Sequence, residues 1–102
     1  MYPVTSKISA EGLLILTSLA DGPKHGYAIL QDIARTTGRE LGFGSLYGAI
    51  ARLETAGYIV ALAHNGPRRP YRLTPSGAQA LRADLASLRT VVAVAERRLG
   101  SR

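Results

Sequence analysis

One short segment of this chain interrupts a pattern that is otherwise helical. Residues 58–63 read YIVALA and residues 71–73 read YRL, and both runs are rich in side chains that favour strands. Between them lies HNGPRRP, which contains an Asn-Gly pair typical of tight turns and two prolines. The segment therefore predicts a β-hairpin that carries Arg68 and Arg69 at its tip.

Three short helices are expected before this hairpin, because apolar side chains recur there at helical spacing. The first runs from Ser9, a typical N-cap residue, to about residue 20. The second covers about residues 25–37 and the third about residues 43–56, and each is followed by a glycine that can end a helix. The expected order is therefore helix, helix, turn, helix and hairpin.

A longer helix is expected after the hairpin. Thr74 is a typical N-cap residue, and Pro75 suits the first helical position because its missing N–H would be unpaired there anyway. The helix can pack on its own domain or on a partner, and a partner is favoured because the helix reaches beyond the small core. Apolar side chains recur along it at the alternating spacing of a seam between packed helices: Leu81, Leu85, Leu88, Val92, Ala95 and Leu99.

The first helix is apolar around most of its circumference, because Leu14 and Ile15 lie beside the stripe of Leu13, Leu16 and Leu19. A helix of this kind must bury more than one face. In a chain of 102 residues, the second face is expected to contact another subunit. The expected dimer interface combines the first and last helices: Leu13, Leu14, Leu16, Leu81, Leu85, Leu88, Val92, Ala95 and Leu99.

The formal net charge is +6, and the whole excess lies in the second half of the chain. Up to residue 50 the basic and acidic residues balance, whereas Arg52, Arg68, Arg69 and Arg72 are opposed by Glu54 alone. A localised basic surface is typical of proteins that bind nucleic acid or a membrane surface. A basic surface that only keeps the protein in solution is the simpler alternative.

Together these elements predict a mainly α fold with a small β-hairpin, namely a winged helix-turn-helix with a C-terminal dimerisation helix. Residues 1–74 are expected to form a DNA-binding domain and residues 75–102 the dimerisation helix, as one compact unit. In such a fold the third helix enters the major groove of double-stranded DNA. The hairpin reaches the flanking backbone or the minor groove, where a narrow groove attracts arginine.

The outward face of the third helix carries small and polar residues. Gly48 would let the backbone approach DNA, Ser45, Arg52 and Thr55 can bond to bases or phosphates, and the Tyr47 hydroxyl can bond to a phosphate. Alternatively, these are only small surface residues. The expected DNA contacts are Ser45, Tyr47, Gly48, Arg52, Thr55, Arg68, Arg69, Arg72, Lys24 and Arg39.

Catalysis and metal binding find little support. The chain has no cysteine, and His25 and His64 lie far apart without an acidic cluster, so both are interpreted as structural or surface residues. Neither a metal nor a cofactor is expected. The seven carboxylates are scattered, and Ser45 lacks the G-x-S-x-G surroundings of a hydrolase nucleophile, so the protein is not expected to be an enzyme.

No apolar run is long enough to cross a bilayer, which requires about 20 residues. The run LLILTSLA at residues 13–20 is similar to the apolar part of a signal peptide. Glu11 and Gly12 precede it, however, where basic residues would be required. The protein is therefore expected to be cytoplasmic and to have no membrane partner.

Three linked motifs resemble the PadR-type transcriptional regulators: LLILTSLADGPKHGYAIL, SLYGAIARLETAGYI and RRPYRLTPSG. They cover roughly residues 13–77. Two positions depart from the family pattern, because Gly48 replaces a proline and Pro70 replaces the first tyrosine of the wing strand. The residues that fall on the pattern are Gly22, His25, Gly26, Tyr27, Leu30, Ser45, Leu46, Tyr47, Ala49, Arg52, Leu53, Glu54, Gly57, Arg68, Arg69, Tyr71, Leu73 and Thr74.

The resemblance implies a homodimeric bacterial repressor, with its first and last helices in the dimer interface. It also implies that a small-molecule effector, held near that interface, releases the operator DNA. Because the interface stripes contain Leu, Val and Ala without tryptophan, simple packing is favoured over a ligand pocket. The alternative function is a protein-interaction module that uses a winged-helix scaffold without specific DNA binding.

Overall fold

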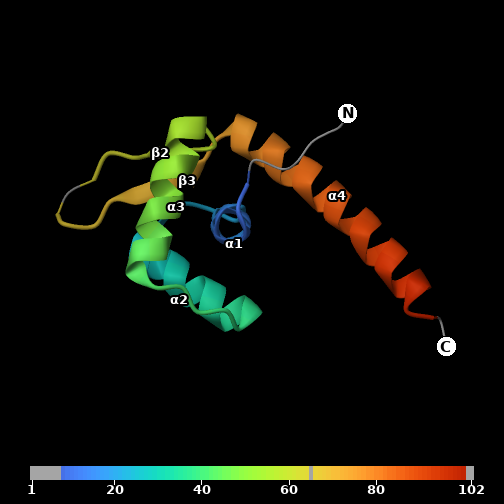
Figure 1. Cartoon of the computed structure of the whole chain (residues 1–102). Helices are drawn as coiled ribbons and strands as arrows, with labels where there is room; N and C mark the ends of the chain where they lie inside the picture. Colours follow the sequence, from blue (N-terminus) through green and yellow to red (C-terminus); the bar gives the residue numbers. More distant parts are fainter. Residues whose placement is uncertain (1–7, 65, 101–102) are drawn as a thin grey trace.

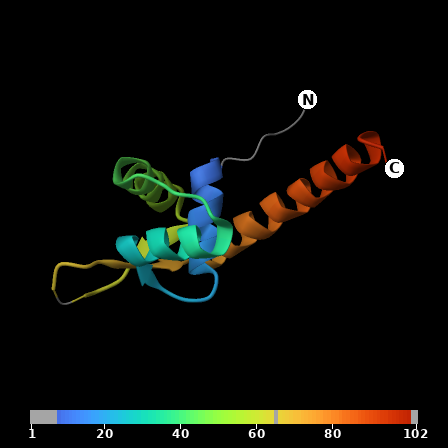
Figure 2. The same ribbon diagram turned by 90° about the horizontal axis from the view of Figure 1, so that it is seen from below.

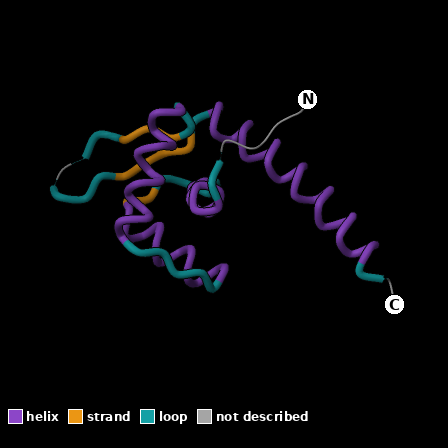
Figure 3. The backbone as a smooth tube through the Cα atoms, in the orientation of Figure 1, coloured by secondary structure: helices purple, strands orange, loops and turns teal. Residues whose placement is uncertain are grey.

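The computed structural model describes residues 8–64 and 66–100 of the chain. It is mainly helical, with a small three-stranded antiparallel sheet (Figures 1 and 3). This confirms the mainly α fold with a small β element expected from the sequence, while the dimerisation role of the last helix stays a prediction. The elements, in chain order, are α1 (Ala10–Leu19), β1 (Lys24–His25), α2 (Gly26–Thr37), α3 (Phe43–Ala56), β2 (Ile59–Ala61), β3 (Pro70–Leu73) and α4 (Pro75–Arg98).

The helix ends follow the capping chemistry expected from the sequence. The hydroxyls of Ser9 and Thr74 each accept a hydrogen bond from the backbone N–H three residues ahead, at 3.0 Å. Gly38 and Gly57 end α2 and α3 with φ angles of 75° and 82°, a conformation that other residues rarely adopt. These four predictions are confirmed, and they fix the lengths of the helices around the sheet.

The sheet has one strand more than the predicted hairpin. Its order is β1-β3-β2, so that β3 pairs with β2 on one side and with the two-residue strand β1 on the other. Tyr71 lies at the centre, opposite Lys24 of β1 and Ala61 of β2. Strand β2 is also shorter than expected, since it ends at Ala61 rather than at residue 63. The predicted Asn-Gly turn includes Asn65, which lies outside the described residues.

Helix α1 is the centre of the fold. It is seen end-on in the middle of Figure 1, and it contacts α2, α3, α4 and β3. The buried apolar side chains come from every helix and from two strands: Ile15, Leu16, Leu19, Ile29, Ile33, Leu46, Ala49, Ile50, Leu53, Ile59, Tyr71 and Leu81.

Two residues assigned to the dimer interface belong to this core instead. Leu16 has no exposed surface, and Leu81 is 7% exposed. Their side chains are covered by the protomer's own helices, so the prediction that they contact a partner is wrong. Leu13, Leu14 and Leu85 are half-buried and pack against the edge of the core.

The first turn of α4 is held tightly against the beginning of β2. The backbone N–H of Thr74 donates to the Tyr58 carbonyl at 3.0 Å, and the Thr74 hydroxyl donates to the Gly57 carbonyl at 2.7 Å. Gly77 is buried at the same place, where a methyl group would overlap the Tyr58 carbonyl oxygen. These contacts set the direction in which α4 leaves the domain.

After its first three turns α4 projects away from the core (Figures 1 and 2). The radius of gyration is 15.2 Å, against about 13 Å for a compact chain of this length. Apolar side chains continue along the projecting part, where Leu88, Val92 and Leu99 are 39%, 52% and 85% exposed. Val91, which was not expected to contribute, is exposed beside them. None of the helices in the described ranges is long and apolar enough to span a membrane.

Candidate nucleic-acid interface

Helix α3 turns a stripe of small residues away from the core. Leu46, Ala49, Ile50 and Leu53 face inward and are buried. Because successive residues of an α-helix are rotated by about 100°, the positions opposite this buried face are 44, 48, 51 and 55. They carry glycine, glycine, alanine and threonine. A surface of such small side chains lets the helix backbone approach a flat or grooved partner closely.

Longer polar side chains flank this stripe. Ser45 and Arg52 lie along one side and Tyr47 along the other, and all three are exposed. A methyl group built on Gly48 would lie 3.6 Å from Arg52 Nη1. The Arg52 guanidinium therefore lies over the small stripe, where it can reach a base edge or a phosphate.

The wing, defined as residues 59–73 with β2 and β3 at its base, carries three exposed arginines: Arg68, Arg69 and Arg72. Arg68 Nη1 lies 3.4 Å from His25 Nε2, and Arg72 Nη1 donates to the Leu73 carbonyl at 3.5 Å. Within the described residues, no carboxylate forms an ion pair with any of them. Their positive charge is thus available to an anionic partner.

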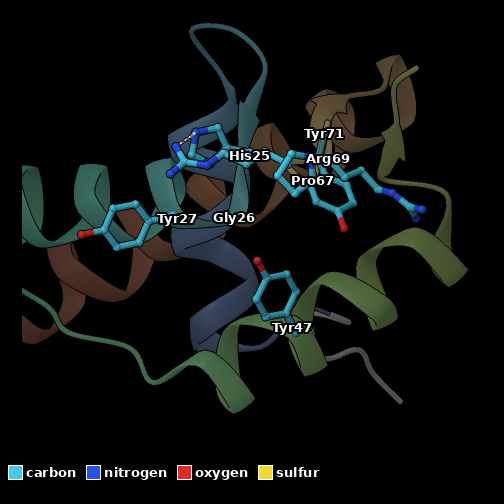
Figure 4. A pocket seen from close by; sticks show the side chains of 8 residues that line it. His25, Gly26, Tyr27, Tyr47, Pro67, Arg69 and Tyr71 are labelled. Atoms are coloured by element: carbon cyan, nitrogen blue, oxygen red, sulfur yellow. Dashed lines mark hydrogen bonds between the residues drawn. The ribbon is translucent and has the colours of Figure 1, made fainter. Parts of the chain in front are cut away.

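A cavity of about 220 Å³ lies between α3, the first turn of α2 and the wing (Figure 4). The side chains of His25, Tyr47, Arg68, Arg69 and Tyr71 line it. Figure 4 shows the Tyr47 and Tyr71 hydroxyls directed into the space between α3 and the strands. The described residues that line the cavity include cationic and hydroxyl side chains and no carboxylate.

Gly26 affects the shape of this cavity, and the surroundings of Tyr71 affect its chemistry. A methyl group on Gly26 would overlap the Tyr47 hydroxyl, so glycine at this position allows α2 and α3 to approach each other. Burial raises the pKa of Tyr71 above its usual value, and the charge of Glu54 raises it further. The Tyr71 hydroxyl consequently stays protonated at neutral pH and can donate a hydrogen bond.

The structure brings together most of the residues predicted to bind DNA, but not all. Ser45, Gly48, Arg52 and Thr55 share the outward side of α3, while Tyr47, Arg68 and Arg69 surround the adjacent cavity. Arg72 is exposed on β3. Arg39 is exposed in the connection between α2 and α3 and does not line the cavity.

Lys24 is engaged within the protomer. Its ammonium group donates to the Asp21 carboxylate and to the Ser18 carbonyl oxygen. The hydrogen bond from Lys24, together with its charge, lowers the pKa of Asp21. The charge of Lys24 is therefore balanced locally, and its contact with DNA stays a prediction that the structure does not favour.

His25 is the residue that the sequence-based interpretation missed. It was interpreted as a structural or surface histidine, and its Nδ1 atom does cap α2 by accepting a hydrogen bond from Ala28 N–H at 3.3 Å. Its Nε2 atom, however, faces Arg68 at the cavity. The signals in the sequence were its position at the start of a helix and its place on the family pattern, and neither identifies Arg68 as its neighbour.

Metal chemistry has no basis in the described residues. In that part of the chain, no three His, Asp or Glu side chains come together as metal ligands would. The sequence contains no cysteine to extend such a group. What the site offers is a shallow, cationic surface beside a helix with small residues.

Comparison with known proteins agrees with this geometry. A model of the family described as "Transcriptional regulator PadR-like family" matches residues 15–83. A PadR family transcription regulator from Clostridium difficile superposes with a TM-score of 0.82 at 27% identity, covering 90% of this chain and all of that one (100%). A transcriptional regulator from Clostridium thermocellum superposes with a TM-score of 0.79 at 28% identity, covering 86% and 90%.

A curated relative is much longer than this chain. It is an uncharacterised 37.1 kDa protein in transposon TN4556 of Streptomyces fradiae, and it is 47% identical over 76 residues. The match covers 74% of this chain but only 22% of that protein.

Proposed function

The chain belongs to the PadR-like family of transcriptional regulators, and we propose that it is a homodimeric repressor that binds specific sites in double-stranded DNA. One observation carries the proposal. The outward face of α3 and the wing lie at one end of the molecule, while the projecting part of α4 lies at the other (Figure 2). A protomer of this shape can offer one end to DNA and the other to a second copy.

The DNA-binding end, within residues 1–74, reads a duplex through two elements. Helix α3 lies in the major groove, where its small stripe permits close approach and Ser45 and Arg52 reach base edges or phosphates. The wing arginines Arg68 and Arg69 bind the flanking backbone or enter the minor groove. Few side chains on α3 are long enough for bidentate base contacts, so most of the affinity comes from phosphates.

The dimer is held by residues 75–102 together with the edge of α1. Leu81 and Leu85 pack on the protomer's own core, and Leu88, Val92 and Leu99 continue the same stripe beyond it. A second copy covers this continuation most simply, because two identical stripes can pack in a two-fold arrangement. The two α3 helices then bind half-sites separated by about 10 base pairs or a multiple of that. Release of the DNA by a small molecule stays a prediction from the family resemblance.

Selection of DNA fragments tests this function directly. Purified protein is incubated with a pool of genomic and random-sequence duplexes, and the retained fragments are sequenced. We expect enrichment of sequences that contain two related half-sites at fixed spacing. If the fragments are no more enriched than with a basic control protein, specific DNA binding is excluded and the protein-interaction function becomes the better explanation.

A second prediction concerns the contribution of the wing arginines to DNA binding. Replacing Arg68 and Arg69 by alanine is expected to weaken binding to the selected duplex roughly tenfold or more, because each protomer then has two fewer cations that bind phosphates. The slope of log Kd against log salt should also fall, by roughly 0.9 for each phosphate that the variant no longer neutralises. Fluorescence anisotropy titrations at several salt concentrations measure both quantities.

A control variant tests whether the effect comes from contacts of the wing arginines or from the lower net charge of the protein. Arg97 and Arg98 are exposed at the far end of α4, so their replacement by alanine removes the same charge at a distance from the wing. This control should change affinity and salt slope much less. Equal effects of the two double substitutions would show that net charge, rather than the wing, determines binding.

A further inference from the structure

We propose that His25 and Arg68 together bind one backbone phosphate of the DNA, in the cavity between α3 and the wing. The inference rests on the proposed function and adds to it a residue that the sequence did not identify. It starts from the two nitrogen atoms of a single imidazole ring. His25 Nδ1 is 3.3 Å from the backbone nitrogen of Ala28, and His25 Nε2 is 3.4 Å from Arg68 Nη1.

The capping contact decides where the proton of His25 lies. A neutral imidazole has one N–H donor and one acceptor nitrogen. Ala28 N–H lies in the first turn of α2 and has no acceptor within the helix, so it donates to His25 and Nδ1 must be the acceptor. The proton is therefore on Nε2, which faces Arg68.

Two donors consequently face each other in the wall of the cavity. A guanidinium group has only N–H donors, and Nε2–H is a donor as well, so the 3.4 Å contact between them cannot be a good hydrogen bond. Both N–H groups are satisfied together when an oxygen acceptor lies in front of them. An anionic oxygen fits best, because one of the two donors carries a full positive charge.

The rest of the cavity has the same preference. Arg69 also lines it, and the hydroxyls of Tyr47 and Tyr71 are directed into it. The first turn of α2, a helix of 12 residues, contributes the positive end of its dipole. Among the described residues that line the cavity, none is a carboxylate that could form an ion pair with Arg68.

The position of the cavity identifies the anion as a phosphate of the duplex. In the proposed complex α3 occupies the major groove and the wing reaches the minor groove. The strand that separates these two grooves must then pass between α3 and the wing, which is where the cavity lies (Figure 4). Its phosphates are the anions that pass closest to His25 and Arg68.

Two substitutions of His25 separate capping from phosphate binding. In His25→Asn the side-chain oxygen replaces Nδ1 as the cap, and no atom remains at the position of Nε2. In His25→Gln the amide nitrogen replaces Nε2 as a donor, and the cap is lost. Asparagine should therefore preserve folding and impair binding, whereas glutamine should do the opposite.

The expected results are quantitative. For His25→Asn we expect an unchanged melting temperature and about tenfold weaker binding to the selected duplex, with little change in salt slope because the neutral imidazole is lost and the Arg68 charge is kept. For His25→Gln we expect affinity within about twofold of the parent and a melting temperature lower by about 5 °C. If His25→Asn binds the duplex as tightly as the parent, the inference is overturned.

Duplexes in which one phosphate at a time is made neutral can show which phosphate His25 contacts. Duplexes that carry a methylphosphonate at one position at a time should bind the parent protein less tightly at one phosphate in each half-site. His25→Asn should be insensitive to the methylphosphonate at that position, because the contact is already absent. Equal sensitivity of both proteins at every position would contradict the assignment.

Competition with inorganic phosphate tests whether the cavity binds a phosphate of the DNA backbone or a free phosphate ion. If phosphate competes with DNA no better than sulfate or chloride at equal ionic strength, the cavity binds the duplex backbone. If phosphate binds the parent but not His25→Asn, and DNA binding is equal in the two proteins, the cavity binds a free anion and the inference is wrong. A parent protein that binds no DNA at all would overturn the proposed function together with this inference.

Discussion

Replacing Leu88 and Val92 by glutamate is expected to convert the protein from a dimer to a monomer. In the protomer these side chains are 39% and 52% exposed, so the isolated chain tolerates charged residues there. In the proposed dimer they lie in the seam between two α4 helices, where unpaired carboxylates would be buried at a cost of several kcal/mol. The single copy of the domain should therefore keep its fold and lose its partner.

DNA binding should fall with the dimer. A dimer binds its second half-site at a high effective concentration, and loss of this linkage weakens binding by about 100- to 10,000-fold. Sedimentation velocity measures the mass of the variant, circular dichroism its folding, and anisotropy its affinity for the selected duplex. A variant that stays dimeric would show that the stripe on α4 is not the interface.

The control places the same charges on the opposite face of the helix. Ala83 and Thr90 are exposed, and their spacing of seven residues puts both of them away from the seam. Replacing them by glutamate should leave mass and affinity unchanged. If this control also becomes monomeric, the face of α4 that contacts the partner has been assigned wrongly.

The second large effect is expected from Gly77→Ala. The added methyl group would overlap the Tyr58 carbonyl oxygen, which cannot move away without loss of its hydrogen bond to Thr74 N–H. Overpacking of this kind costs roughly 3 kcal/mol of unfolding free energy, which lowers the melting temperature by about 15 °C in a domain of this size. Thermal denaturation followed by circular dichroism measures the shift.

The control is Gly44→Ala, the same substitution at a position where it should raise the stability of the protein rather than lower it. Gly44 is the second residue of α3 and has open space around the position of a methyl group. Alanine there reduces the conformational entropy of the unfolded chain and should stabilise the protein by about 0.5–1 kcal/mol. A Gly77→Ala variant that melts within about 2 °C of the parent would contradict the close contact between α4 and β2.

The parts of the fold that depend on local chemistry were predictable from the sequence. Ser9, Thr74, Gly38 and Gly57 act within three or four residues of their own position, so the sequence alone identifies the helix ends. The change from helical to strand pattern likewise identified β2 and β3. Strand β1 was missed because two residues carry no periodicity, and only its distant partner β3 defines it.

The parts that depend on distant contacts were not predictable. An apolar pattern shows that Leu16 is buried but not what covers it, and the protomer's own helices cover it. His25 is ambiguous for the same reason, because its neighbour Arg68 lies 43 positions further along the chain. The sequence identifies the basic side chains of the surface, whereas the structure alone shows which of them converge on one cavity.

The way in which α4 is attached has a consequence for the choice of operator. This helix is about 36 Å long in total, its first three turns touch the domain, and the remainder extends away from it toward the proposed partner contact (Figure 2). A tilt of about 10° where Thr74 and Gly77 fix it would move the far end by about 6 Å, which approaches two base-pair steps of about 3.4 Å. In the proposed dimer, small differences in packing at the base of α4 would therefore change the distance between the two α3 helices and so the spacing of the half-sites that the protein binds.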